Sequence, residues 1–299
     1  MILNSHAHVR KTTFALSALL ALIVALAISG GDATAAKKKK IVALTPFSAN
    51  SLAYTGTVPV AVGVQAVGNK AGSPKLKRVR KLTLSHPNGP NMEEITKIDP
   101  DVVLSASSWA KGNKTMKDLA ITVRNMDPAT VKQVVPKLKA IGNAYGNKKK
   151  TAAYAKKVQK QIRYATTGRK ITKRPKVLLI LGVGRSPNLF LKNSWGASVM
   201  KAAGATLLGS ELSASSGFQR VSDEYILQQD PDIIIAVPHG ATKDIPEIQK
   251  YYENNPAWSS TRAVQTGNVK MITDDALLQP DTDVGNTIKR LRTKYLKNW

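Results

Sequence analysis

The chain has 299 residues, a net charge of +26 and no cysteine. Without cysteine it has no disulfide framework, no thiolate metal site and no cysteine nucleophile. The charge suggests a polyanionic partner such as an anionic cell surface, although a solvated basic surface would explain it equally well. No nucleic-acid partner is expected, because only 5% of the residues are aromatic and single strands bind by stacking on aromatic side chains.

The first 36 residues are arranged like a secretory signal peptide. Arg10 and Lys11 precede an apolar run over residues 14–28, and small residues follow as far as Ala36. The apolar run is roughly 15 residues long, shorter than the ~20 that cross a bilayer as a helix. We therefore expect an exported protein that is cleaved near Ala36, and we exclude residues 1–36 from the fold.

The rest of the chain is long enough to form two lobes. Residues 41–44 are apolar and precede a proline, a pattern that predicts a buried strand. A weaker strand is predicted over 58–62. Pro59 would restrict it to a sheet edge or a strand start, and Gly63 would end it.

A helix cap and a strand follow. Asn91 can cap a helix with Glu94 three residues later, and this helix should end before Asp99. Residues 101–106 are rich in valine and leucine without alternation, which is typical of a strand in a parallel sheet that is buried on both faces.

The middle of the chain is predicted to be helical. Asp127 and Pro128 indicate a helix start, Pro136 should kink or split this helix, and Gly142 should end it. Apolar residues then recur three and four positions apart over residues 148–167, between lysines and arginines. This pattern predicts one long amphipathic helix, which we interpret as the connector between two lobes.

The second half begins with an apolar strand over residues 177–181, followed by glycines at 182 and 184 and by Arg185. A glycine-rich turn after a strand can bind phosphate. The pattern here lacks the third glycine of a dinucleotide site and the Gly-Lys-Ser/Thr of a phosphate loop. Close approach of a ligand to the end of the strand explains the glycines equally well.

A short internal repeat supports two similar lobes. At an offset of 131 residues, Glu93 pairs with Glu224, the Asp-Pro-Asp of 99–101 with that of 230–232, and apolar strands follow both. Glu93 and Glu224 lie in the exposed first turn of their helices. They either interact with the helix dipole or form a matched pair of contacts for a basic partner.

Together these patterns predict an α/β protein with two Rossmann-like lobes and a ligand cleft between them. The expected parts are an N-terminal lobe over residues 37–147, a single long connecting helix over 148–170 and a C-terminal lobe over 171–299.

Two histidines remain outside the signal peptide. His239 follows a strand at its carboxyl end, where open α/β sheets bind ligands, and His86 precedes the helix that Asn91 caps. Each alone is typical of a surface loop, but two imidazoles can coordinate iron or haem. Hydrolysis by Ser194 or Ser198 is disfavoured, because no Gly-x-Ser-x-Gly elbow is present. A site of two histidines and a carboxylate would have only Asp244 close to His239 in the sequence.

The chain resembles the substrate-binding proteins of ABC importers for iron-siderophores, haem and cobalamin. The segments that carry this resemblance are residues 41–46, 91–104, 138–147 and 222–235. Within this class, other segments resemble the haem-binding components of iron-regulated surface determinant systems, namely residues 87–91, 239–241, 251–252, 255–258, 263–264 and 267–269.

The resemblance implies haem capture rather than enzymatic turnover, with His239 as an axial haem ligand. Asn88 occupies the position of the family's second ligand, a methionine. We expect either that His86 replaces it in a bis-histidine site or that His239 is the sole axial ligand of a five-coordinate site; Met92 is a weaker alternative. Arg185 is a candidate contact for a propionate, unless it is a solvated loop residue. Alternatives are a ferric siderophore or cobalamin on the same fold, or a basic cell-surface adhesin.

The resemblance also implies a membrane partner. In this family one glutamate of each lobe docks onto arginines of the permease, and these glutamates correspond to Glu93 and Glu224. Residues 28–31 resemble a lipoprotein processing box in which glycine replaces the lipidated cysteine. No thioether lipid can form there, so the protein would be released, held by its charge or retained by an uncleaved signal.

Overall fold

The computed structural model describes residues 38–65, 72–167, 173–240 and 242–297. Contacts separate residues 1–39 from one unit that runs from Lys40 to Trp299, and only this second unit is described below. The predicted signal peptide lies outside the described residues. Among the described residues, no helix is long and apolar enough to cross a bilayer.

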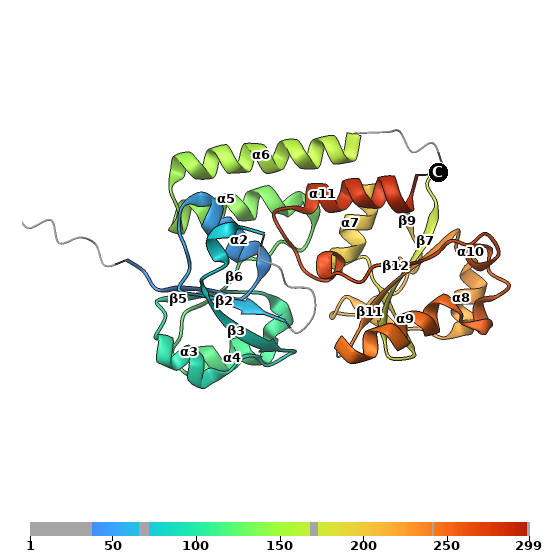
Figure 1. Ribbon diagram of the computed structural model, residues 1–299, viewed down its shortest axis with the longest axis horizontal. Coiled ribbons are helices and arrows are strands. Elements are labelled where there is room, and N and C mark those ends of the chain that lie inside the picture. Colours follow the sequence, from blue (N-terminus) through green and yellow to red (C-terminus); the bar gives the residue numbers. More distant parts are fainter. Residues whose placement is uncertain (1–37, 66–71, 168–172, 241, 298–299) are drawn as a thin grey trace, which may run out of the picture. The chain divides into compact units, whose positions relative to one another are not determined.

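The first half of the unit is built on one sheet (Figure 1). Its strand order is β4-β3-β2-β1-β5-β6, and all neighbouring strands are parallel except β3 and β4. The strands are β1 (Ile41–Ala43), β2 (Ala61–Val64), β3 (Arg80–Ser85), β4 (Gly89–Pro90), β5 (Val102–Ser105) and β6 (Val123–Asn125).

Side chains on β1 and β5 alternate between two apolar clusters, because successive residues of a strand point to opposite faces. Ile41 and Leu104 pack with helices α2 (Pro46–Thr55) and α5 (Val134–Tyr145). Val42 and Val103 pack with the opposite pair, α3 (Met92–Ile98) and α4 (Ala110–Asp118). Burial on both faces explains the continuous apolar runs in these strands.

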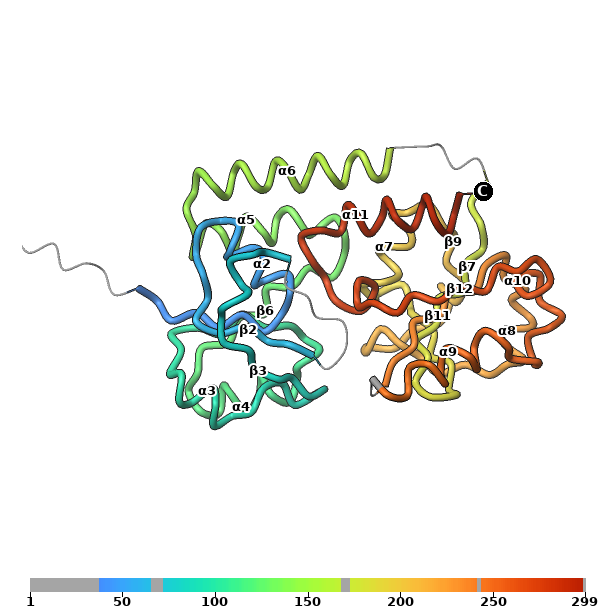
Figure 2. The backbone as a smooth tube through the Cα atoms, viewed as in Figure 1, coloured from blue at the N-terminus to red at the C-terminus, as the bar shows by residue number. Residues whose placement is uncertain are grey.

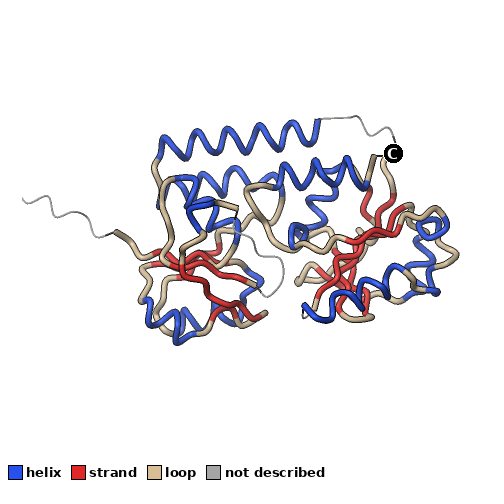
Figure 3. The backbone as a smooth tube through the Cα atoms, viewed as in Figure 1, coloured by secondary structure: helices blue, strands red, loops and turns tan. Residues whose placement is uncertain are grey.

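The second half is built on another sheet, of order β10-β8-β7-β11-β12, with β9 beside the start of β7. Its strands are β7 (Lys176–Val183), β8 (Ser186–Phe190), β9 (Thr206–Leu207), β10 (Phe218–Arg220), β11 (Ile233–His239) and β12 (Val269–Met271). Its helices are α7 (Trp195–Ala203), α8 (Asp223–Gln229), α9 (Ile245–Glu253), α10 (Arg262–Gln265) and α11 (Val284–Arg290). Figure 3 separates the helices from the strands by colour.

The predicted amphipathic helix over residues 148–167 is confirmed as α6 (Lys148–Thr167), and residues 168–170 of the predicted connector lie outside the described residues. Its Ala155 and Val158 are fully buried in a cluster that includes residues of both sheets. Tyr154 donates a hydrogen bond to the Thr282 hydroxyl over 2.9 Å, so α6 is also tied to the segment before α11. The chain path along α6 and α11 can be followed in Figure 2.

The repeat predicted from the sequence recurs in three dimensions. Asp99 and Asp230 end their helices with φ of 50° and 38°, in the left-handed region. Asp101 accepts a hydrogen bond from the backbone N–H of Lys40 over 2.6 Å. Asp232 accepts the equivalent bond from Lys176 over 2.8 Å. Each Asp-Pro-Asp therefore ends a helix and ties the start of the following strand to the start of a neighbouring strand. The first copy joins β5 to β1, and the second joins β11 to β7.

The predicted start and end of the helix after Asp127 are wrong. A short 3-10 turn, Val131–Gln133, precedes α5, so Pro136 lies in the first turn of α5, where a missing N–H costs no helical hydrogen bond. Gly142 lies inside α5 and does not end it. A Cβ on Gly142 would lie 2.3 Å from Oγ1 of Thr151, so this glycine permits close packing of α5 on α6.

Two further glycine predictions need correction. Gly63 lies within β2, an internal strand, and a Cβ there would lie 2.5 Å from the carbonyl oxygen of Leu44. Gly182 lies within β7, and Gly184 forms the turn into the antiparallel strand β8. A phosphate loop leads from a strand into a helix, so this hairpin turn does not have that architecture.

Candidate functional site

The two histidines lie at the carboxyl ends of strands in different sheets. His239 is the last residue of β11, which lies between β7 and β12. His86 directly follows β3. Ligands of open α/β sheets bind at this end of the strands.

A pocket of about 160 Å³ brings the two histidines together. Its other lining residues include Trp109, whose ring centre lies 6.1 Å from that of His86. Both histidines are exposed, so a ligand can reach their rings. The sequence predicted both as candidate ligands but gave no indication of Trp109.

A second pocket of about 300 Å³ also includes His239 and Gly240 in its lining. On this side Arg185 forms an ion pair with Glu247 over 3.4 Å, and its guanidinium lies 5.6 Å from the ring centre of Tyr251. Arg185 and Glu247 are both largely exposed. His239 therefore lies where the two pockets meet.

The environment of His239 favours a neutral ring. Desolvation by the surrounding protein lowers the pKa of His239, and the nearby His86 lowers it further. Imidazole binds metals through a deprotonated ring nitrogen, so this shift keeps His239 competent for coordination at neutral pH.

The loop after His86 is held against α4. A Cβ on Gly112 would lie 2.1 Å from the carbonyl oxygen of Asn88, so only glycine allows this contact. Met92 is half-buried and packs against the apolar cluster beneath α3 and α4. The Met92 side chain therefore packs in the apolar cluster, which is consistent with the prediction that Met92 is a weaker candidate than His86 as an iron ligand.

Glu93 and Glu224 occupy equivalent positions at the starts of α3 and α8, and both are exposed. The caps differ, because Asn91 accepts from the N–H groups of Glu93 and Glu94, whereas Ser222 accepts from that of Tyr225. A hydrogen bond from Ser222 lowers the pKa of Glu224. Within the described residues, neither Glu93 nor Glu224 forms an ion pair with a side chain.

The serines named as hydrolytic candidates have structural hydrogen bonds. Ser194 caps α7 by accepting from Ala197 N–H and donating to the carbonyl of Leu191. Ser198 accepts from Val131 N–H over 2.9 Å. Asp244 lines the second pocket with His239. No cluster of three or more metal-ligating His, Asp or Glu side chains occurs in the described parts of the chain.

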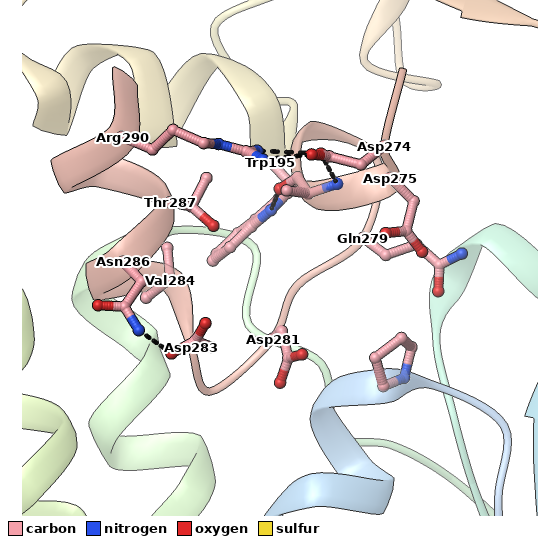
Figure 4. Close-up of a pocket in the computed structure, with 12 residues that line it drawn as sticks. Trp195, Asp274, Asp275, Gln279, Asp281, Asp283, Val284, Asn286, Thr287 and Arg290 are labelled. Atoms are coloured by element: carbon pink, nitrogen blue, oxygen red, sulfur yellow. Dashed lines mark hydrogen bonds and ion pairs between the residues drawn. The ribbon is translucent and has the colours of Figure 1, made fainter. Parts of the chain in front are cut away.

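Asp274 and Asp275, which we did not identify from the sequence, also line the histidine pocket. They continue into an adjacent pocket of about 260 Å³ that Figure 4 shows. There Asp274 forms hydrogen-bonded ion pairs with Arg290 through both of its oxygens. These aspartates follow β12 by a few residues, so the rule that ligands bind beyond the carboxyl ends of strands could have indicated them.

The fold agrees with a family comparison. The model of the periplasmic binding protein family matches residues 41–276. The chain therefore belongs to the periplasmic binding protein family, which confirms the resemblance noted in the sequence.

Individual relatives differ in ligand. The chain is 25% identical over 263 residues to a cobalamin-binding protein of Halobacterium salinarum, covering 86% of this chain and 69% of that protein. It is 26% identical over 193 residues to the high-affinity heme uptake system protein IsdE of Staphylococcus aureus, covering 62% and 64%. The crystal structure of S. aureus IsdE complexed with heme shares the fold, with a TM-score of 0.72, 21% identity and coverage of 86% and 98%.

Proposed function

We propose that this chain is the extracytoplasmic substrate-binding component of an ABC importer and that it captures a metal tetrapyrrole, with His239 as an axial ligand. Haem is the ligand that the sequence resemblance implies. The observation that carries the proposal is the pair of accessible imidazoles on one pocket at the carboxyl ends of the strands.

Imidazole coordination suits a tetrapyrrole better than a bare ion. Two imidazoles supply too few ligands for an isolated transition metal, whereas a tetrapyrrole brings four nitrogens of its own. Trp109 adds an aromatic surface beside His86. Ligand sites for drug-sized molecules typically have volumes of about 300 to 1,000 Å³, so a tetrapyrrole would need both pockets that meet at His239.

Cobalamin is the second candidate ligand. The cobalamin-binding relative covers 86% of this chain, compared with 62% for the heme uptake relative. Imidazole coordinates the cobalt of a corrinoid as well as the iron of haem, so the same histidine serves both candidates. In a ferric siderophore the chelating groups of the siderophore occupy the coordination positions of the iron. His239 would then contact the siderophore and would not coordinate the metal.

The second axial position is assigned to His86. Asn88 provides an amide, which is a poor ligand for iron, whereas His86 lines the same pocket as His239. Arg185 remains our candidate for contact with a ligand carboxylate, although Glu247 already shares its charge. Delivery to the permease is assigned to Glu93 and Glu224.

Coordination is tested by replacing each histidine and supplying the lost ring in solution. With haem bound, His239→Gly should lose the wild-type Soret maximum, and added imidazole should restore it by filling the cavity. His86→Gly should change the spectrum while retaining binding. If both variants keep the wild-type spectrum, the histidines are not axial ligands.

Docking is tested by reversing the charge of both glutamates. Glu93→Arg with Glu224→Arg should abolish uptake in cells and leave ligand affinity unchanged, because both side chains are exposed at helix starts. Asp118→Arg, at an exposed site at the end of α4, makes the same charge reversal as each single glutamate variant and serves as its control. An equal loss of ligand affinity would place the glutamates in the binding site or the fold instead.

A further inference from the structure

The surroundings of His239 have the opposite charge balance to the protein as a whole. The chain has 45 Lys and Arg against 19 Asp and Glu. In the two pockets that share His239, Arg185 is the only lysine or arginine among the described residues. The acidic ones are Asp244, Glu247, Asp274 and Asp275. The general excess of positive charge therefore does not extend to the ligand site.

Of these four acids, two form ion pairs and a third is exposed to solvent. Glu247 pairs with Arg185, and Asp274 is held by Arg290. Asp244 lies just before α9 and is exposed. Asp275 is different, because its carboxylate forms no hydrogen bond or ion pair with another side chain in the described part of the chain. Figure 4 draws the contact from Arg290 to Asp274 and none from Asp275.

The ionised form of Asp275 is unfavourable in this position. Burial is the main cause that raises the pKa of Asp275 to about 7, and the nearby carboxylates of Asp274 and Asp281 add to it. The other charged or titratable side chains that line the pockets around Asp275 are His86, His239, Asp283 and Arg290. A hydrogen bond from its own backbone N–H opposes this rise in the pKa of Asp275. Because no other side chain of the described residues donates to this desolvated carboxylate, a donor on a ligand would recover free energy.

Building on the proposed function, we infer that Asp275 is a specificity-determining residue: it accepts a hydrogen bond from an N–H donor on the rim of the bound tetrapyrrole and repels ligand carboxylates. The rim of a corrinoid carries carboxamides, whereas the rim of haem carries two propionates and no N–H donor. The site therefore takes an amide-bearing corrinoid in preference to haem.

The geometry also assigns an orientation to any carboxylate-bearing ligand. Asp274 and Asp275 occupy one pocket and Arg185 the other, with His239 between them. Ligand carboxylates are disfavoured on the Asp275 side, so haem propionates would have to lie toward Arg185 or in solvent. This restriction acts on haem and not on a corrinoid whose side chains are amides.

The inference is tested with the full-length chain at pH 8, above the raised pKa of Asp275, where its carboxylate is ionised, using aquacobalamin, haem and haem dimethyl ester as probes. Wild type should bind aquacobalamin at least about tenfold more tightly than haem, since a hydrogen bond to a charged group is worth about that factor. Asp275→Asn should weaken aquacobalamin binding and strengthen haem binding by about threefold to tenfold. The dimethyl ester, which has no carboxylate, should respond little. Asp118→Asn removes the same charge at an exposed site and should change none of the three affinities.

The outcomes separate the two proposals. If the wild type binds haem more tightly than aquacobalamin, or if Asp275→Asn shifts haem and its ester equally, the role of Asp275 is refuted while tetrapyrrole capture stands. If neither haem nor aquacobalamin binds, the proposed function itself fails. A circular dichroism melt that matches the wild type shows that the Asn variant is folded.

Discussion

Replacing Asp127 by asparagine tests how this fold tolerates a carboxylate held away from water. Asp127 accepts a hydrogen bond from the Thr45 hydroxyl over 2.6 Å, and Thr45 in turn caps α2 by accepting from Ser48 N–H. Burial is the main cause that raises the pKa of Asp127 from its ordinary value of 3.8 to about 7, although hydrogen bonds from the hydroxyls of Thr45 and Ser48 oppose the shift.

The raised pKa fixes the sign of the pH dependence. Between pH 4 and 7 the folded chain holds the Asp127 proton and the unfolded chain releases it, so the free energy of unfolding falls as the pH rises. The cost of ionising Asp127 is complete only above about pH 7. At about 1.4 kcal/mol for each pH unit between the two values, this cost is at most about 4 kcal/mol.

The assay is urea unfolding of wild type and Asp127→Asn from pH 5 to pH 8. Asparagine keeps an acceptor for Thr45 and cannot ionise, so the stability of the variant relative to wild type should increase with pH. Other acids with raised pKa values, such as Asp275, titrate in both proteins and cancel in the difference. Parallel pH profiles of the two proteins would refute the reasoning, and Asp118→Asn, an exposed replacement, should give such a parallel profile.

Two further predictions concern packing and capping. Gly142→Ala should destabilise the fold by about 1–3 kcal/mol in urea unfolding, because its Cβ would meet Thr151, and adding Thr151→Ala should recover most of the loss. No recovery would show that α5 and α6 are not in close contact at this point. Asn91→Ala and Ser222→Ala should each cost about 1 kcal/mol through lost helix caps, and a cost near zero for both would contradict the cap assignments.

Features set by local chain properties were predictable from the sequence. The amphipathic pattern over residues 148–167 coincides with α6, because periodicity reports directly which face of a helix is buried. Asp99 and Asp230 end their helices, and Asp101 and Asp232 bind the start of a neighbouring strand. The repeated Asp-Pro-Asp was therefore predictable because each copy has the same local structural role. The N-cap at Asn91 was predictable for the same reason.

Features set by distant parts of the chain were not predictable. Gly142 looked like a helix stop, yet it is required by the packing of Thr151 from the next helix. Gly182 and Gly184 looked like a ligand loop, but β8 folds back on β7 as an antiparallel partner, and nothing local in the glycine pattern shows this.

The candidate site was only half predictable. His86 and His239 could be named because the chain has so few histidines, because His239 follows a predicted strand and because His86 precedes the helix that Asn91 caps. The strand that ends just before His86 was not predicted. Trp109 and Asp275 belong to the same pocket through tertiary packing, and neither lies in a motif. The charge of the pocket was also hidden, since an average over a chain with a net charge of +26 conceals a local acidic patch.

The central claim is that His239 coordinates the metal of a tetrapyrrole. Its most direct test is the absorption spectrum of the purified chain after addition of one equivalent of haem and, in a separate sample, of aquacobalamin. At least one ligand should show a shifted band in wild type that is lost in His239→Ala. If both spectra remain those of the free ligands, or if the shift persists without His239, the claim is contradicted.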